Sequence, residues 1–201
     1  MDIGVLYKVT IFWVIFYMTP GPVWVSVMEA TRKLSFTGIW QFFIRVFLPV
    51  NASVQFLQAL ICAIFVEFVA TIFSQIGLLF YILGGSYIAY LAYKTIKSKK
   101  SNTLLELSFH HLALVMLLSP KIWLLFPSGA VIASHLSQNI ITNAFVFAFI
   151  MFVVSNLMFV LYAIIGKIGT KLLKDNFSYL AFWLLVLFAS FLFYEAYKVL
   201  L

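Results

Sequence analysis

Two proline-containing stretches, Thr19-Pro20-Gly21-Pro22 and Ser119-Pro120-Lys121, interrupt apolar segments of this chain. A proline inside a helix removes a backbone donor and clashes with the preceding turn, so each stretch predicts a helix break. Freed backbone groups are tolerated at membrane depth only where protein or a wet cavity covers them. Breaks at matching places in two halves of a membrane chain predict a binding site where the broken helices meet.

The composition around these breaks indicates that the bilayer is the solvent. The 201 residues are 65% hydrophobic and 9% charged, whereas roughly a quarter of the residues in a soluble domain are charged. Because a spanning helix takes about 20 apolar residues, we predict an all-α integral membrane protein with a single transmembrane domain, residues 1–201, and six spans. The predicted spans are Ile3–Met28, Gly38–Ala63, Ile76–Ile96, Leu112–Ile132, Thr142–Ile165 and Tyr179–Val199.

The charges between these spans predict an orientation. Nine basic residues fall in the first, third and fifth loops, whereas the second and fourth loops contain none. The nine are Arg32, Lys33, Lys94, Lys97, Lys99, Lys100, Lys167, Lys171 and Lys174. The positive-inside rule places these loops in the cytoplasm and both chain ends outside. The net charge of +7 is therefore attributed to orientation and anionic lipid, and nucleic-acid binding is not expected.

The two halves of the chain resemble each other. Tyr90-Leu91-Ala92-Tyr93-Lys94 ends the third predicted span and Tyr194-Glu195-Ala196-Tyr197-Lys198 ends the sixth. Asn51 in the second span corresponds to Asn156 in the fifth. We predict one repeat over about residues 1–100 and a second over about 101–201. Three spans per repeat is an odd number, so the second repeat is expected to be inverted, as in many secondary transporters.

Two basic residues, Lys121 and Arg45, lie away from the ends of their predicted spans, where a charge costs roughly 2.5–3.5 kcal/mol on insertion scales. Lys121 is expected to face the interior, where it would hold a carboxylate or take part in proton coupling. The alternative is a lysine that braces the broken helix. Arg45 is expected to act as an anion clamp, with snorkelling to the headgroups as the alternative.

Three further polar residues are open to two interpretations. Asn51 and Asn156 are candidates for substrate binding, although hydrogen bonding between neighbouring helices is the commoner role of such amides. Glu29 is expected to be a solvated interfacial residue, with titration during transport as the alternative. Gly84 and Gly85 are expected to allow two helices to approach closely.

Several kinds of site are not expected. Cys62 is the single cysteine, which excludes an intrachain disulfide and makes a thiolate metal cluster improbable. No phosphate loop, nucleophile–base pairing or metal-ligand spacing is present in the sequence. We therefore predict that the protein is not an enzyme and binds neither cofactor nor metal.

Thr19-Pro20-Gly21-Pro22, the Gly84-Gly85-Ser86-Tyr87-Ile88-Ala89-Tyr90-Leu91 stretch and Ser119-Pro120-Lys121 together resemble the lysine exporter (LysE/RhtB) family. The resemblance covers nearly the whole chain. It implies a prokaryotic inner-membrane exporter of amino acids driven by the proton-motive force, with the first and third motifs as the transport core. The family usually has Asp or Asn where this chain has Val23 and often has Asn where it has Ser119. The missing acidic residue favours a neutral or apolar amino acid over lysine.

Two alternative functions remain open at this point. The wider superfamily includes heavy-metal exporters, but a lone cysteine and the cations Arg45 and Lys121 disfavour a metal cargo. A membrane scaffold or subunit that keeps the fold without transporting is the other alternative. The partners considered are an amino-acid substrate, membrane lipid and a second copy of the chain.

Overall fold

The computed structural model describes residues 2–100, 107–173 and 176–200. Over these ranges the chain forms helices joined by short turns, and no β-strand occurs in them. Residues 101–106, with which the second repeat was expected to begin, and the predicted loop residue Lys174 lie outside the described residues.

The first half of the chain is built from helices α1 to α6. They are α1 (Ile3–Met18), α2 (Pro22–Thr31), α3 (Phe36–Phe42), η1 (Phe43–Phe47), α4 (Leu48–Val50), η2 (Asn51–Gln55), α5 (Phe56–Ile64) and α6 (Val66–Lys100). The second half follows with α7 (Phe109–Leu117), α8 (Pro120–Ala133), α9 (Ile140–Leu173) and α10 (Asn176–Leu200).

The spans agree with a membrane protein. Four helical segments are long and apolar enough to cross a bilayer: Phe36–Ile64, Gln75–Lys97, α9 and α10. Two bent pairs, α1 with α2 and α7 with α8, bring the number to six if each pair counts as one span. Each pair bends by 62° at its break. The prediction of an all-α membrane protein with breaks at both proline stretches is confirmed.

The second span contains two π-helical turns, η1 and η2, on either side of Pro49. Proline cannot donate to the helical ladder, and its ring displaces the carbonyl one turn earlier, which explains widened turns at this point. The second and third membrane-length segments end at Ile64 and begin at Gln75, close to the predicted Ala63 and Ile76. The connection between them is largely helical, since Phe65 alone separates α5 from α6.

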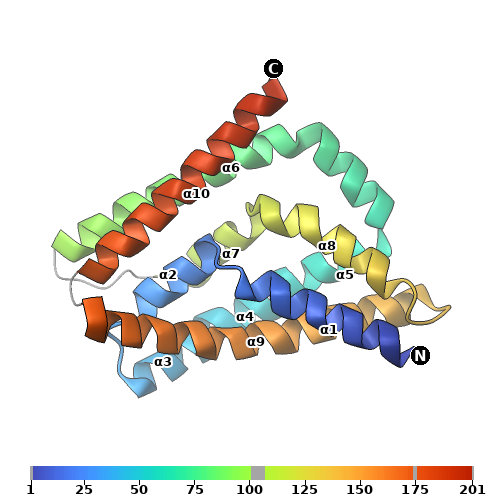
Figure 1. The fold of residues 1–201 in the computed structure, drawn as a ribbon, viewed down its shortest axis with the longest axis horizontal. Helices are drawn as coiled ribbons and strands as arrows, with labels where there is room; N and C mark the ends of the chain where they lie inside the picture. The colour runs from blue at the N-terminus through green and yellow to red at the C-terminus, as the bar shows by residue number, and fades with distance from the viewer. Residues whose placement is uncertain (1, 101–106, 174–175, 201) are drawn as a thin grey trace.

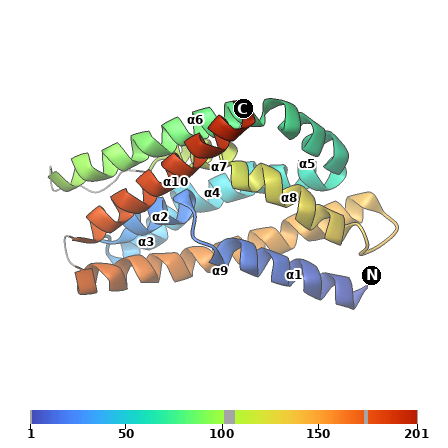
Figure 2. The same cartoon turned by 45° about the horizontal axis from the view of Figure 1, so that its top comes forward.

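Helices of the first half of the chain pack against helices of the second half (Figures 1 and 2). Helix α10 lies along α6, and α5 packs on α9. Helix α1 contacts both α8 and α9, while α2 contacts α9 and α10. The core between α1, α8 and α9 is aromatic. The Trp13 ring centroid lies 4.7 Å from that of Phe126 and 4.6 Å from that of Phe147.

Close approach at glycine fixes two of these packings. A Cβ atom on Gly84 of α6 would lie 2.5 Å from the Leu118 carbonyl oxygen, at the break between α7 and α8. A Cβ atom on Gly166 of α9 would lie 2.7 Å from the Met28 carbonyl oxygen of α2. The expected role of Gly84 is confirmed, since only a glycine lets α6 reach this backbone without displacing it.

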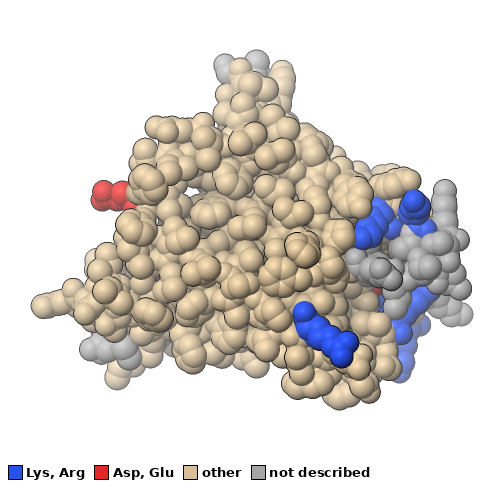
Figure 3. Space-filling view, turned by 180° about the vertical axis from the view of Figure 1, so that it is seen from behind, with Lys and Arg blue, Asp and Glu red and all other residues tan. Residues whose placement is uncertain are grey.

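On the face that Figure 3 shows, the basic side chains lie toward one end of the molecule. In Figure 1 this is the left end, where α2, α6 and α9 finish, while the N-terminus and the start of α6 lie at the right. The helix ends that precede the three loops predicted to be basic therefore lie at one end of the molecule.

Candidate functional site

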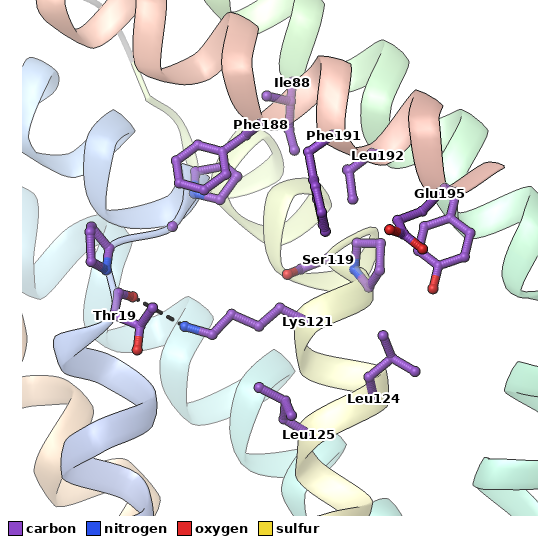
Figure 4. A pocket seen from close by; sticks show the side chains of 15 residues that line it. Thr19, Ile88, Ser119, Lys121, Leu124, Leu125, Phe188, Phe191, Leu192 and Glu195 are labelled. Carbon is purple, nitrogen blue, oxygen red and sulfur yellow. Dashed lines mark hydrogen bonds between the residues drawn. The ribbon is translucent and has the colours of Figure 1, made fainter. Parts of the chain in front are cut away.

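The two breaks meet at one cavity of about 460 Å³ (Figure 4). Seven of the ten predicted site residues line it: Thr19, Pro20, Gly21, Pro22, Ser119, Pro120 and Lys121. The remaining wall is mostly apolar and comes from α6, α8 and α10, including Ile88, Leu124, Phe188 and Phe191. The cavity thus joins a polar break region to an apolar wall.

Lys121 reaches across this cavity from α8 to the end of α1 (Figure 4). Its Nζ donates to the Phe16 carbonyl oxygen at 2.7 Å and to the Thr19 carbonyl oxygen at 3.1 Å. It also lies 4.3 Å from the centroid of the Phe16 ring. The C-terminal end of a helix carries partial negative charge, so an ammonium group is favourable there. In this arrangement Lys121 faces the interior and braces the first break.

The other carbonyls at the end of α1 are also paired. The Tyr162 hydroxyl of α9 lies 3.1 and 3.2 Å from the Tyr17 and Met18 carbonyl oxygens, which share its one proton. The Thr19 amide and hydroxyl donate to the Ile15 carbonyl oxygen. Sequence reasoning missed Tyr162, because one tyrosine in an apolar helix carries no spacing signal.

The second break is held differently. The Trp123 indole nitrogen donates to the Leu117 carbonyl oxygen at 2.7 Å, within the same broken helix. The Gln58 amide of α5 approaches the Met116 carbonyl oxygen at 3.5 Å. Gln58 was also missed, although a buried amide in an apolar span is itself a signal for such a contact.

The helices that follow the breaks begin at the cavity. Pro22 opens α2 and Pro120 opens α8, and neither helix has a side-chain hydrogen bond at its N-terminal cap. The first amides of a helix carry partial positive charge and attract anions. Gly21, which precedes α2, is buried, yet a Cβ atom there would meet nothing within 4 Å. The missing side chain leaves the start of α2 open to a ligand.

Three predicted site residues lie outside the cavity. The Asn51 amide donates to the Ser155 hydroxyl of α9 at 2.6 Å, and the Asn156 amide donates to the Phe152 carbonyl oxygen at 2.8 Å. Asn51 thus follows the alternative of hydrogen bonding between helices, and Asn156 bonds within its own helix. Arg45 is exposed on the second span, as the snorkelling alternative expects.

Glu195 of α10 lines the cavity and was not predicted as a site residue. Its carboxylate pairs with Lys198 at 2.8 Å, and its side chain keeps 25% of its surface exposed. An acidic residue inside a predicted span was the signal that could have identified it.

No cluster of three metal-ligating side chains occurs among the residues that the structure describes. No family model, no curated protein and no solved structure matches this chain.

Proposed function

We propose that this protein is a secondary transporter of the lysine exporter type, which exports neutral or apolar amino acids across the prokaryotic cytoplasmic membrane at the expense of the proton-motive force. One observation carries the proposal. The starts of α2 and α8 and the ammonium of Lys121 meet at a cavity whose other walls are largely apolar. The helix starts and the Lys121 ammonium are favourable partners for a carboxylate. The apolar walls are favourable for an apolar side chain.

The substrate carboxylate would compete for Lys121. Its ammonium now bonds to two carbonyl oxygens at the end of α1, and a carboxylate is a stronger acceptor for a charged donor. Binding would therefore loosen the brace between α8 and α1. The substrate ammonium would then take the carbonyl oxygens that Lys121 releases.

The proposed inverted repeats have support in the packing. Exchanging the two halves maps α1 on α7, α2 on α8, the α3–α5 span on α9, and α6 on α10. Under this exchange the contact of α6 with α8 corresponds to that of α10 with α2, and the contact of α5 with α8 corresponds to that of α9 with α2. Rocking of one repeat against the other around the breaks would alternate access.

The proposed orientation follows from the basic end. Arg32 and Lys33, with the ends of α6 and α9, define the cytoplasmic side, so both ends of the chain are proposed to be extracytoplasmic.

The function is tested by efflux from proteoliposomes preloaded with a panel of labelled amino acids, with and without an imposed pH gradient. We expect gradient-accelerated efflux of apolar amino acids and a loss of at least about tenfold, equivalent to about 1.4 kcal/mol, in Lys121→Ala. Arg45→Gln is the matched control, because it also removes a basic side chain from a span but lies outside the cavity. No flux of any amino acid from folded protein would overturn the proposal in favour of a scaffold.

Gly21→Ala separates binding from folding. A Cβ atom at this position would meet nothing within 4 Å, so we expect normal folding. It would nevertheless project beside the start of α2 and hinder a carboxylate there. Reduced flux at unchanged thermal stability supports the site, and unchanged flux places the carboxylate elsewhere.

A further inference from the structure

A buried charged cluster lies at the basic end of α2, away from the cavity. Glu29 is 1% exposed and Arg32 is 4% exposed. The Arg32 Nε donates to the Glu29 Oε1 at 2.8 Å, and the buried Ser178 hydroxyl of α10 donates to the same oxygen at 2.9 Å. The expectation that Glu29 is solvated at the interface is therefore wrong, because α9 and α10 cover this end of α2.

Two polar atoms of this cluster have no hydrogen-bond partner in the described part of the chain, namely Glu29 Oε2 and Arg32 Nη1. Burying an ion pair is costly even when every donor and acceptor is satisfied, and an unsatisfied one costs more. The pair lies within one helical turn, so it does not join two helices. Apolar residues at these two positions would stabilise the packing at lower cost, which argues that the pair has a function.

Contacts of α2 with α9 and α10 close the molecule around this cluster. The Met28 backbone of α2 lies against Gly166 of α9, and Ser178 ties Glu29 to α10. Among the described residues, the charges that act on the Glu29 carboxylate are Arg32 and Lys33, from the end of its own helix and the turn that follows. Helix α10 contributes the Ser178 hydroxyl, and α9 contributes the bare backbone of Gly166. Ser26, one turn nearer the breaks, has a buried hydroxyl without a partner among the described residues.

We propose that the Glu29 carboxylate is the binding site of the coupling proton, and that its ionised form keeps the cytoplasmic end closed by holding Arg32 and Ser178. The inference rests on the proposed function, which supplies a proton gradient. A proton that adds to Oε2 converts the carboxylate to a neutral carboxyl group. Arg32 then remains as a buried charge without a counterion, and its cheapest route to solvation is outward to the cytoplasmic water. That movement separates α2 from α10.

The proton that binds to Glu29 is released again within one transport cycle. In the opened state the carboxyl group gives its proton to the cytoplasmic water, and the restored carboxylate rebinds Arg32 and Ser178. One proton enters the cell for each closure of this end. Ser26 lies between the breaks and Glu29 along α2, on the side from which the proton would arrive.

The first experiment separates proton coupling from substrate exchange. Proteoliposomes with wild type, Glu29→Gln or Glu67→Gln are loaded with unlabelled leucine, valine and phenylalanine, and the labelled amino acids are added outside at equal pH to measure exchange. Transport driven by a pH gradient is measured in parallel. Glu67 is the matched control because it is an exposed glutamate at the start of α6.

We expect Glu29→Gln to keep exchange and to lose gradient-driven accumulation, whereas Glu67→Gln keeps both. A Glu29→Gln variant that still accumulates substrate overturns the proton site and leaves the proposed function intact. A folded Glu29→Gln variant that loses exchange as well assigns the residue to substrate binding or structure and also overturns it. If wild type performs neither reaction, the proposed function itself fails.

A second measurement needs no substrate. In a Cys62→Ser background, Ala181→Cys places a thiol one turn beyond Ser178, at a position that is 3% exposed. Glu29→Gln imitates the protonated state, so we expect its thiol to react with a maleimide from the cytoplasmic side at least about tenfold faster than in the Glu29 background. Equal reaction rates would show that ionised Glu29 does not hold this end closed.

Discussion

The two proline breaks have the same bend, 62°, but different supports. The end of α1 is held by side chains from two other helices, Lys121 of α8 and Tyr162 of α9. The end of α7 has its shortest hydrogen bond from Trp123 of its own broken helix, while α5 adds a longer contact through Gln58 and α6 packs against it at Gly84. The hydrogen bonds that stabilise a proline break can therefore come mainly from other helices or mainly from the broken helix itself. This difference determines which helix movements break those bonds.

The difference has a mechanical consequence. Any displacement of α8 or α9 relative to α1 breaks bonds at the first break. The indole bond at the second break joins α8 to α7 within one broken helix, so it is lost only if the bend of that helix changes. We infer that the first break responds to rearrangement of the second half of the chain and that the second break is the more rigid. Each of the following substitutions disturbs one of the contacts that stabilise a break.

Lys121→Met should have the largest effect. It keeps the chain length but leaves the Phe16 and Thr19 carbonyl oxygens without their charged donor, at a cost of about 3 kcal/mol in the free energy of unfolding. Thermal unfolding in detergent is followed by the reaction of Cys62, which is 0% exposed, with a thiol-reactive dye. Arg45→Met is the control and should change stability by less than about 0.5 kcal/mol. Equal stability of both variants would mean that Lys121 does not brace the break.

Gly84→Ala should have the second largest effect, a decrease of about 2 kcal/mol in the free energy of unfolding. Its Cβ would lie 2.5 Å from a backbone oxygen that has no rotamer to change, so α6 must move away from the second break. Gly77→Ala on the same helix is the matched control, since its Cβ would lie 3.4 Å from the Phe73 ring. The same unfolding assay compares them. If the two variants unfold at the same temperature, the second break does not depend on this contact.

Tyr162→Phe tests the remaining long-range support of the first break. It removes the hydroxyl that bonds to the Tyr17 and Met18 carbonyl oxygens but keeps the ring, whose centroid is 4.7 Å from that of Trp24. The hydroxyl has one proton, which the two carbonyl oxygens share. Hydrogen bonds between membrane helices contribute about 0.6 kcal/mol on average and up to about 1.7, so the loss of this shared bond should cost about 1 kcal/mol in the free energy of unfolding. A double variant with Lys121→Met should lose more than the sum if the two side chains support one structure. Simple additivity would argue for independent roles.

The elements that sequence predicted best are those set by backbone chemistry. Proline at residues 20 and 120 cannot continue a helix, so both breaks were predictable without tertiary information. Length and hydropathy likewise placed the spans, including the gap between Ile64 and Gln75. They did not show that this connection is helical, because an apolar helix and an apolar loop share the same composition. Phe65 ends one helix and α6 resumes at once.

The site was predictable only in part, because the rest of it depends on which helix faces which. Thr19 and Lys121 were identified from their positions in broken spans, and they do meet. Tyr162 comes from another helix, and nothing local distinguishes it from an interfacial tyrosine. Glu195 carried a local signal, an acidic residue inside a predicted span, but its place at the cavity depends on how α10 packs. Glu29 shows the opposite error: its position near a span end predicts solvation, whereas packing of α9 and α10 buries it.

Trp123→Phe should have the smallest effect and is the sharpest test of the difference between the breaks. It removes one hydrogen bond, to the Leu117 carbonyl oxygen, and should cost about 0.6 kcal/mol. Because that bond lies within one broken helix, it should be additive with Lys121→Met, in contrast to Tyr162→Phe. The three single and two double variants are compared by Cys62 reactivity during thermal unfolding. Strong coupling between Trp123 and Lys121 would show that the two breaks share one support, and the proposed division into a responsive and a rigid break would then be abandoned.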